Sequence, residues 1–422
     1  MEIKKLLIII TIIANIGLIK AQYTAIPDTC FELILIANGI DSEGTEDGQV
    51  LTSDIANVVG LDLGYFGNCD VLDASGIEDF TNLEFLFIGH SITSIDLSNN
   101  LQLKEITALD GNLQDINITN CTELEVLWII YNQLTYIDLS TNINLEYLYL
   151  SFNSLLNIDT LNNLNLLRFY CDNNQLTEVN INHLINLNDF GCSNNLITNL
   201  DINNLNQLTR IHANRNIIST INISNLKNIE NIGISSNDLT EIDLSSLLNL
   251  EGINLNNNQL TEIDLSTLPN LERVRLQNNQ LVFLDLRNNN NNNFSYFDIE
   301  NNPNLNCVFV DNAQYSQSNW THISSNSTFV ETESECEALQ INANVIENEF
   351  SFYPNPVKNI LTIKTPNTTI KEIKIYTVLG KEIIKTTNKK IDLSYLSNDI
   401  YIVKITTSEN NIITKKIVKN DN

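Results

Sequence analysis

Basic residues are scarce in this chain of 422 residues. It contains 23 Lys and Arg against 51 Asp and Glu, so its formal net charge is −28. Proteins that bind nucleic acid present a basic face to the phosphates, so this composition argues against that class and predicts no nucleic-acid partner. Residues 22–344 hold 42 acidic and 8 basic residues, whereas residues 345–422 hold 8 acidic residues and 12 Lys. We therefore expect an acidic body and a mildly basic tail with separate tasks.

Long apolar runs are scarce as well, and the one present lies at the N-terminus. Lys4 and Lys5 precede a mostly apolar stretch over residues 6–19, and Ala21 then offers a small residue for cleavage before Gln22. This is the pattern of a secretory signal peptide over residues 1–21. A membrane anchor is the alternative, but the run is short for crossing a bilayer. No later run is long enough, so we expect no transmembrane segment in the mature chain.

Asparagine, in contrast, is abundant and makes up about a sixth of the chain. Many of these Asn belong to a repeat with a period of 21, which reads LxxLxLxxNxLTxIDLSxxxN. Its first place holds Leu103, Leu124, Leu145, Leu166, Leu187, Leu208, Ile229, Leu250 and Leu271. Its ninth place holds Asn132, Asn153, Asn174, Asn195, Asn216, Asn237, Asn258 and Asn279. Such self-similarity predicts a solenoid in which each unit covers the apolar side of its neighbour.

Each part of the repeat has a physical interpretation. The stretch LxxLxL alternates, which predicts a short strand with its Leu side chains pointing inward. The Asn at the ninth place can bond neighbouring backbone groups from inside, so stacked Asn should form a ladder that satisfies buried polar backbone. The IDLS stretch also alternates, and the unit is too short for a full helix. We therefore expect short extended or 3₁₀ segments on the outer side.

The unit resembles the leucine-rich repeat of secreted Bacteroidetes proteins, with about ten copies over residues 83–293. Residues 26–60 resemble the N-terminal cap of that family, and residues 303–336 resemble its closing segment. The resemblance implies a mainly β protein, a solenoid with parallel strands on its concave face. The N-terminal cap would occupy residues 22–82 and the C-terminal cap residues 294–336, where the family's two Cys are expected to pair.

Seven Cys in an exported chain predict some disulfides and a leftover thiol. Four of them flank the repeats, two before and two after, and we expect each couple to pair locally: Cys30 with Cys69, and Cys307 with Cys336. Cys171 and Cys192 stand one repeat apart at an inward place, so we interpret them as buried thiols rather than a bridge or a metal site. Cys121 is then the odd one.

The third and fifth places of each repeat should face solvent on the concave side. Aromatic residues gather there on three successive coils, and five of the six Arg of the repeats fall in the third, fifth or eighth place. Aromatic pairs also stabilise strands, by roughly 0.2–1 kcal/mol each, and Arg can simply offset acidic neighbours. We favour a binding surface, because Tyr, Trp and Arg are the usual anchors of interfaces. The predicted ligand-binding residues are Trp128, Tyr147, Tyr149, Tyr170, Arg168, Arg210, Arg273 and Arg275.

Catalysis and metal binding find little support in the sequence. The chain has no GxSxG elbow and no phosphate-binding Gly loop, and His90 and His212 are six coils apart, about 29 Å at the spacing of strands. Calcium is the one cofactor left open, at the DSEGTEDG segment of residues 41–48 or along an acidic column on the outer side. That column comprises Asp96, Asp138, Asp159, Asp201, Asp243, Asp264 and Asp285. We favour a solvated acidic face, and we predict no enzyme, no metal and no cofactor.

The tail is a different kind of sequence. After an acidic linker at residues 337–349, short alternating strands and a hairpin turn at residues 379–381 predict a small β-sandwich over residues 350–422. The segments YPNPVKN, IYTVLGKE and LSNDIYIVKI resemble the type A C-terminal sorting domain of the type IX secretion system. Asp399 departs from that pattern, which usually has Gly there. The sorting motif comprises Tyr353, Pro354, Asn355 and Pro356.

The resemblance implies transport across the outer membrane by the type IX machinery, which becomes a partner of the tail. The body would then be secreted or held at the outer cell surface. We therefore expect an exported, non-catalytic binding or adhesion module that recognises an extracellular protein through its concave face. The alternative is capture of a surface glycan or another polymer by the aromatic residues.

Overall fold

The computed structural model describes residues 22–64, 67, 69–339, 350–365, 369–408 and 412–420. The chain divides into two compact units, Met1–Glu331 and Thr332–Asn422. The predicted signal peptide and residues 340–349 of the predicted linker lie outside the described residues. Across the described ranges, no helix is both long and apolar enough to cross a membrane.

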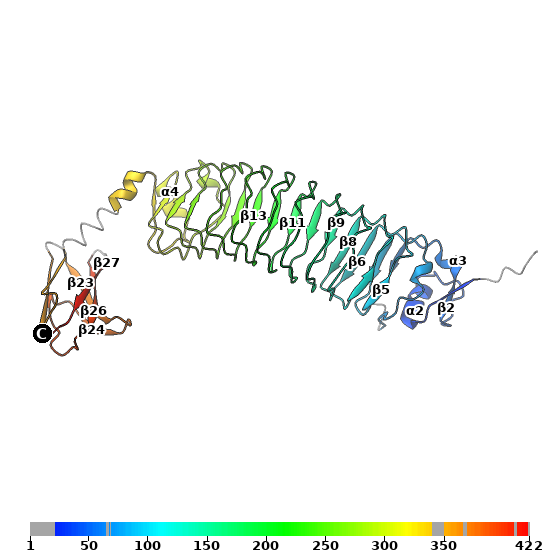
Figure 1. The fold of residues 1–422 in the computed structure, drawn as a ribbon, viewed down its shortest axis with the longest axis horizontal. Coiled ribbons are helices and arrows are strands. Elements are labelled where there is room, and N and C mark those ends of the chain that lie inside the picture. The colour runs from blue at the N-terminus through cyan, green and yellow to red at the C-terminus, as the bar shows by residue number, and fades with distance from the viewer. Residues whose placement is uncertain are drawn as a thin grey trace, which may run out of the picture. The chain divides into compact units, whose positions relative to one another are not determined.

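The first unit is a solenoid built on one sheet of twelve parallel strands, stacked in chain order (Figure 1). The strands are β3 (Gly60–Asp62), β4 (Phe85–Ile88), β6 (Glu105–Leu109), β8 (Val126–Ile130), β9 (Tyr147–Tyr149), β10 (Arg168–Tyr170), β11 (Asp189–Gly191), β12 (Arg210–His212), β13 (Asn231–Gly233), β14 (Gly252–Asn254), β16 (Arg273–Arg275) and β18 (Tyr296–Asp298). The side of this sheet that faces solvent is the predicted concave face.

The period of the repeat sets the register of the sheet. Trp128 pairs with Tyr149, and Tyr149 pairs with Tyr170, so equal places of successive repeats lie side by side. The Leu and Ile of the first place are fully buried from Leu83 to Leu271. Burying one such side chain stabilises a fold by roughly 1.5–3 kcal/mol, so the stacked aliphatic columns hold the coils together.

The sheet is longer than the ten predicted repeats, because one strand from each cap joins it. β3 places Leu61 beside Leu86, and β18 places Phe297 beside Val274. The central residue of each strand is buried, as in the repeats, but these pairs stand 25 and 23 positions apart in the chain rather than 21. One strand from each predicted cap therefore continues the sheet of the repeats.

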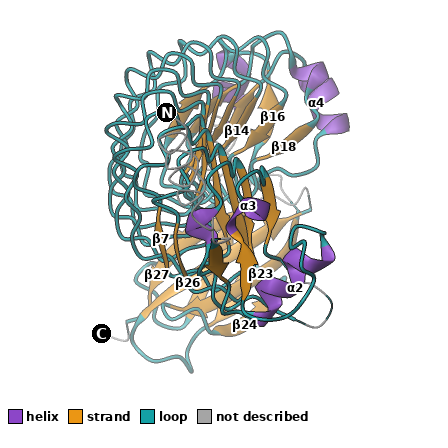
Figure 2. Cartoon of the chain, turned by 90° about the vertical axis from the view of Figure 1, so that its right-hand side faces the viewer, coloured by secondary structure: helices purple, strands orange, loops and turns teal. Residues whose placement is uncertain are grey.

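The outer side of the solenoid consists mainly of loops and turns (Figure 2). Short extended segments appear near the two ends, as two small parallel sheets with two isolated 3₁₀ turns, which agrees with the prediction for this side. They are β5 (Ser94–Asp96), β7 (Asp115–Asn117), β15 (Glu262–Asp264), β17 (Phe283–Asp285), β19 (Cys307–Phe309), β20 (Thr328–Val330), η1 (Ile77–Asp79) and η2 (Asn291–Asn293).

The predicted Asn ladder is present. Asn174 is typical: its Oδ1 accepts a hydrogen bond from the Leu155 amide at 2.9 Å, and its Nδ2 donates to the carbonyls of Leu150 at 2.9 Å and Cys171 at 3.1 Å. Each ninth-place Asn thus joins its own coil to the preceding one. Asn302 extends this ladder beyond the predicted series.

Two further Asn series explain more of the Asn content. A buried one bonds the carbonyls of the preceding coil through the side chains of Asn100, Asn142 and Asn163. Cys121 occupies the same place in the coil between the first two, and its thiol lies 3.3 Å from the Leu97 carbonyl oxygen. An exposed series bonds carbonyls of the preceding coil through Asn144, Asn165, Asn186, Asn228, Asn249 and Asn270.

Replacing Asn174 by Ala is expected to lower the free energy of unfolding by about 2 kcal/mol, because it leaves the buried Leu155 N–H without a partner. The Leu150 and Cys171 carbonyls each lose one donor, although Asn153 and Asn195 still donate to them. Urea unfolding followed by circular dichroism measures this loss. Asn165→Ala is the matched control, since it removes one exposed hydrogen bond and should cost about 0.5 kcal/mol or less. Equal losses in the two variants would contradict a stabilising role for the buried ladder.

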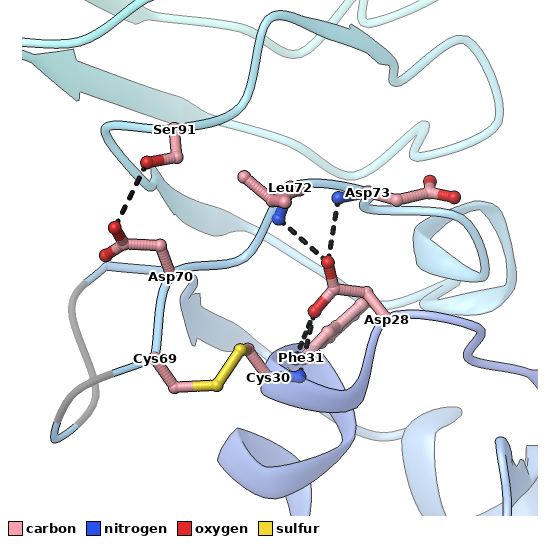
Figure 3. The surroundings of a disulfide bond; sticks show 8 residues. All are labelled: Asp28, Cys30, Phe31, Cys69, Asp70, Leu72, Asp73 and Ser91. Carbon is pink, nitrogen blue, oxygen red and sulfur yellow. Dashed lines mark hydrogen bonds between the residues drawn. A yellow bond between two sulfur atoms is a disulfide. The ribbon is translucent and has the colours of Figure 1, made fainter.

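The N-terminal cap closes the first end of the solenoid. It consists of β1 (Tyr23–Ala25), α2 (Thr29–Ala37), β2 (Gln49–Leu51) and α3 (Thr52–Ile55). The predicted disulfide between Cys30 and Cys69 is present (Figure 3). Beside it, the Asp28 carboxylate caps α2 by accepting from the Phe31 amide, and it also accepts from the Leu72 amide. The disulfide and this carboxylate together fasten α2 to the chain just before the first repeat.

The C-terminal cap closes the other end with β19, β20 and α4 (Ala313–Asn319). Trp320 is buried there and stacks on Phe297, with ring centroids 4.2 Å apart. Cys307 and Cys336 are both disulfide-bonded, and no other cysteine is left to partner either one, so the second predicted bridge is confirmed. Cys121, Cys171 and Cys192 are free and buried, as predicted for the last two.

A thiol reagent such as dithiobis-nitrobenzoate is expected to label no cysteine in the folded protein and three after unfolding without reductant. Burial raises the pKa of Cys121 to about 12, and it also raises the pKa of Cys171 and Cys192 above the ordinary thiol value. Because the thiolate is the reactive form, these groups should be inert as well as inaccessible. Labelling of any of the three in the native protein would contradict the described packing.

The second unit contains two antiparallel sheets. One has three strands, β21 (Ser351–Tyr353), β22 (Ile360–Lys364) and β25 (Lys390–Asp392); the other has four, β23 (Ile370–Thr377), β24 (Glu382–Thr386), β26 (Ile400–Thr407) and β27 (Ile412–Val418). Both sheets contribute to one apolar core, for example through Leu361 and Val403, so the predicted small sandwich is confirmed. The predicted hairpin turn joins β23 to β24, with Gly380 at φ +79°. Asp399 has no positive φ, so the departure from Gly causes no backbone strain there.

Candidate functional site

Three aromatic side chains form a ladder on the concave face. Trp128, Tyr149 and Tyr170 occupy the fifth place of β8, β9 and β10, which are neighbours in the sheet. The ring centroids of Trp128 and Tyr149 lie 5.0 Å apart, and those of Tyr149 and Tyr170 lie 5.6 Å apart. Trp128 is 40% exposed. The structure therefore brings the predicted residues together as one stacked surface that is open to solvent.

Tyr131 and Phe152 form a second aromatic pair, at the eighth place of the coils that carry Trp128 and Tyr149. Their rings stack with centroids 4.0 Å apart, and both are exposed. Both residues have a positive φ, +55° and +58°, a conformation that bulky side chains rarely adopt. Most other coils have Asn, Asp, Ser or Arg at this place. This aromatic pair has an unfavourable backbone conformation and is exposed to solvent. These two features indicate that the aromatic side chains are selected for a role on the surface and not for packing in the core.

The site predicted from the sequence did not include Tyr131 or Phe152. Their place in the repeat could have indicated them, because a residue with a small polar side chain is expected there. We call Trp128, Tyr131, Tyr149, Phe152 and Tyr170 the aromatic patch. Tyr147, at the third place of β9, lies next to it, and the Arg168 guanidinium lies 5.9 Å from the Tyr147 ring centroid.

The four predicted Arg do not form one continuous row of unpaired cations. Arg210 donates to the carboxylate of Asp189, its neighbour on β11, with an Nε–Oδ2 distance of 2.8 Å. Burial and, secondarily, this Asp189 carboxylate raise the pKa of Tyr170 above the ordinary phenol value. Arg210 is therefore held by Asp189 beside Tyr170, the last ring of the aromatic patch. Of the four predicted Arg, only Arg273 and Arg275 lie away from the patch.

A row of hydrogen bonds supports the rim of the same strands. At the seventh place, Asp172 accepts from the Ser193 amide at 2.7 Å and from the Ser151 hydroxyl at 3.2 Å. Asn214 accepts from the amide of Ser235 at 2.9 Å. Burial raises the pKa of Asp172, while these hydrogen bonds oppose that shift. The row joins neighbouring coils from β9 to β13 just before their eighth-place residues, and such support is what a preformed binding surface needs.

Carboxylates of the outer acidic column accept hydrogen bonds from residues that follow closely in the chain. Asp96, Asp138 and Asp243 each accept from the amide of a Ser two residues later, and hydrogen bonds from these Ser lower the pKa of all three carboxyls. In the segment of residues 41–48, Asp41 accepts from the Glu43 amide in the same way. Among the described residues, no group of three or more His, Cys, Asp or Glu is placed to hold a metal ion.

The predicted sorting motif lies at the start of the second unit. Tyr353 ends β21 and is about half exposed. Asn355 holds the segment against β27, because its Oδ1 accepts from the Val418 amide at 2.8 Å and its Nδ2 donates to the Lys416 carbonyl at 3.3 Å. The motif is thus a fixed part of the domain surface.

Comparison with known proteins assigns both units. Residues 351–420 match the family model described as a secretion system C-terminal sorting domain. InlJ of Listeria monocytogenes, whose functional domain is described as including a cysteine ladder, is 20% identical with a TM-score of 0.55, over 95% of this chain and 99% of that one. The internalin InlF of Listeria monocytogenes is 19% identical with a TM-score of 0.56, over 74% and 94%. A search of curated proteins found no match.

These similarities agree with the sequence and the structure. The body has the leucine-rich-repeat fold of the internalins, and the tail is a sorting domain of the type IX secretion system. A tail of this kind directs a protein to the cell surface or the exterior. At such low sequence identity the structural likeness concerns the fold alone, so the role of the concave face has to be argued from its own residues.

Proposed function

We propose that this exported leucine-rich-repeat protein binds an extracellular protein partner through its concave face, without catalysing a reaction. The observation that carries the proposal is the aromatic patch, in which Tyr131 and Phe152 are exposed although their backbone conformation disfavours bulky side chains. Apolar rings that gather on a rigid sheet and remain in solvent mark interaction sites in soluble proteins. Tyr and Trp are also the residues that most often dominate the binding energy of protein interfaces.

Site-directed cross-linking tests this proposal. A photoreactive phenylalanine analogue replaces Tyr131 in one variant and Tyr136 in the control. Tyr136 is a suitable control because it is 60% exposed and lies further along the same coil, on the outer side of the solenoid. On intact cells and surface extracts, we expect a discrete protein adduct from position 131 and none from position 136. An adduct from position 136 alone would place the interaction outside the concave face.

A glycan is the second candidate ligand, and one observation favours it. The ladder places the rings of Trp128, Tyr149 and Tyr170 at intervals of 5.0 and 5.6 Å along the sheet, a row of aromatic groups that successive sugar rings can contact. A glycan array separates this candidate from the first. Binding of a defined glycan that Trp128→Ala abolishes would support the glycan and argue against a protein partner.

A further inference from the structure

A second feature of the concave face lies on β12, β13, β14 and β16, four strands beyond Trp128 at its nearest. It is a hollow of about 190 Å³, well above the space that one water molecule needs. Gly233 and Gly252 lie in its floor. Its polar lining comprises His212, Asn214, Asn231, Asn254, Arg273 and Arg275.

The two glycines keep this hollow open. Neither has a positive φ, so their backbone conformation does not require glycine. A Cβ on Gly252 would lie 2.8 Å from the Asn231 Oδ1 and 3.1 Å from the Arg273 Nε, so these side chains would have to shift from their positions over the hollow. A Cβ on Gly233 would lie 3.1 Å from the Asn214 side-chain nitrogen. The missing side chains thus let their polar neighbours lean over the floor.

The lining of the hollow contains no Asp or Glu, although the chain as a whole has 51. Arg275 is exposed, and its guanidinium stacks on the Tyr296 ring at 4.5 Å. Within the described ranges it has no ion pair. Arg273 is held by a 2.8 Å hydrogen bond from its Nη2 to the Asn231 Oδ1, and its contacts with two half-exposed glutamates are long, at 3.6 and 3.9 Å. Two positioned guanidinium groups therefore face the hollow with donors to spare.

The Oδ1 of Asn254 adds an acceptor to this donor set. That atom is buried, and it has no hydrogen-bond partner among the described residues. Guanidinium groups recognise a carboxylate through paired hydrogen bonds. A lone buried acceptor, in contrast, requires an N–H or O–H from the ligand, since leaving it unsatisfied costs free energy. A peptide segment with an acidic side chain supplies both groups, a carboxylate and a neighbouring backbone N–H.

We infer that this hollow binds an acidic side chain of the partner protein, with the carboxylate held by Arg273 and Arg275 and a peptide N–H donating to Asn254. The inference rests on the proposed function in one respect, that the partner is a protein. The binding energy would come from a site separate from the aromatic patch, beginning two strands beyond Tyr170, or about 10 Å at a strand spacing of about 4.8 Å. A partner would then need both an apolar surface and an acidic segment at that distance.

The test uses the full chain and a synthetic acidic peptide, acetyl-Gly-Glu-Gly-Glu-Gly-amide, with its Gln counterpart as the uncharged control. We expect the acidic peptide to bind in isothermal titration at low salt and to shift the NMR signals of the His212 ring, and the Gln peptide to do neither. Arg275→Ala should weaken binding at least tenfold. Arg215→Ala, which removes an equal charge from an exposed residue outside the hollow, should change it less than twofold. Gly233→Ala should weaken binding without altering charge.

Several outcomes would overturn the inference. Equal losses in the two Arg variants would show attraction by net charge alone, and equal binding of the Gln peptide would exclude a carboxylate site. Binding of trigalacturonate in place of the acidic peptide would assign the hollow to an acidic glycan. Trp128→Ala should leave peptide binding unchanged, so the hollow and the aromatic patch can fail independently of each other.

Discussion

Removal of residues 350–422 is expected to leave the protein in the periplasm, with no detectable amount at the cell surface or in the medium. The tail matches a secretion system sorting domain, so the truncated chain lacks the signal that the outer-membrane machinery recognises. The body should remain folded, because the cores of the two units are separate clusters of side chains. Fractionation followed by immunoblotting, and surface proteolysis of intact cells, measure the distribution.

A matched full-length variant controls for defects of the body. A chain that carries Trp128→Ala and Tyr149→Ala but retains its tail should be exported like the wild type, because both side chains lie on the solvent side of the solenoid. Circular dichroism of the periplasmic truncated protein should show a folded body. If the truncated protein appeared at the surface in wild-type amounts, another part of the chain would direct export.

The fold follows from the sequence because the repeat is regular where packing requires it. The first-place Leu or Ile is buried from Leu83 to Leu271, and the ninth-place Asn is buried from Asn132 to Asn279, so their period survives in the sequence and predicts the register of the sheet. The extra strands β3 and β18 keep a buried central residue but lose the period, as the pairs of Leu61 with Leu86 and of Phe297 with Val274 show. Terminal coils must also meet a cap, and this relaxes the period.

The candidate site was only partly predictable. The places of Trp128, Tyr149 and Tyr170 in the repeat were sufficient to predict their ladder. The pairing of Arg210 with Asp189 was missed, although the two residues stand one period apart in the same column. The hollow at Gly233 and Gly252 was not foreseen, because it depends on which way the neighbouring side chains lean, and a column of residue types does not contain that information.

The second large expected effect is a loss of binding affinity when the aromatic patch is removed. The double variant Trp128→Ala, Tyr149→Ala is expected to weaken binding of the cross-linked partner at least 100-fold, roughly 3 kcal/mol. Trp128→Ala alone should cost about 2 kcal/mol, and the two losses should not add, because the rings contact each other and share one surface. Biolayer interferometry with the immobilised body measures both.

Stability should change little in this double variant, because its side chains point away from the aliphatic core, where the adjacent Leu127 is fully buried. The control is Tyr136→Ala, Leu156→Ala, which removes similar apolar surface from two exposed residues outside the patch, each 60% accessible. It should retain wild-type affinity. If the patch variant also binds at wild-type affinity, the aromatic ladder only stabilises the sheet, and the cost of the positive φ at Tyr131 and Phe152 needs another cause. If both variants lose affinity equally, the partner contacts both sides of the solenoid, and the concave face alone does not define the site.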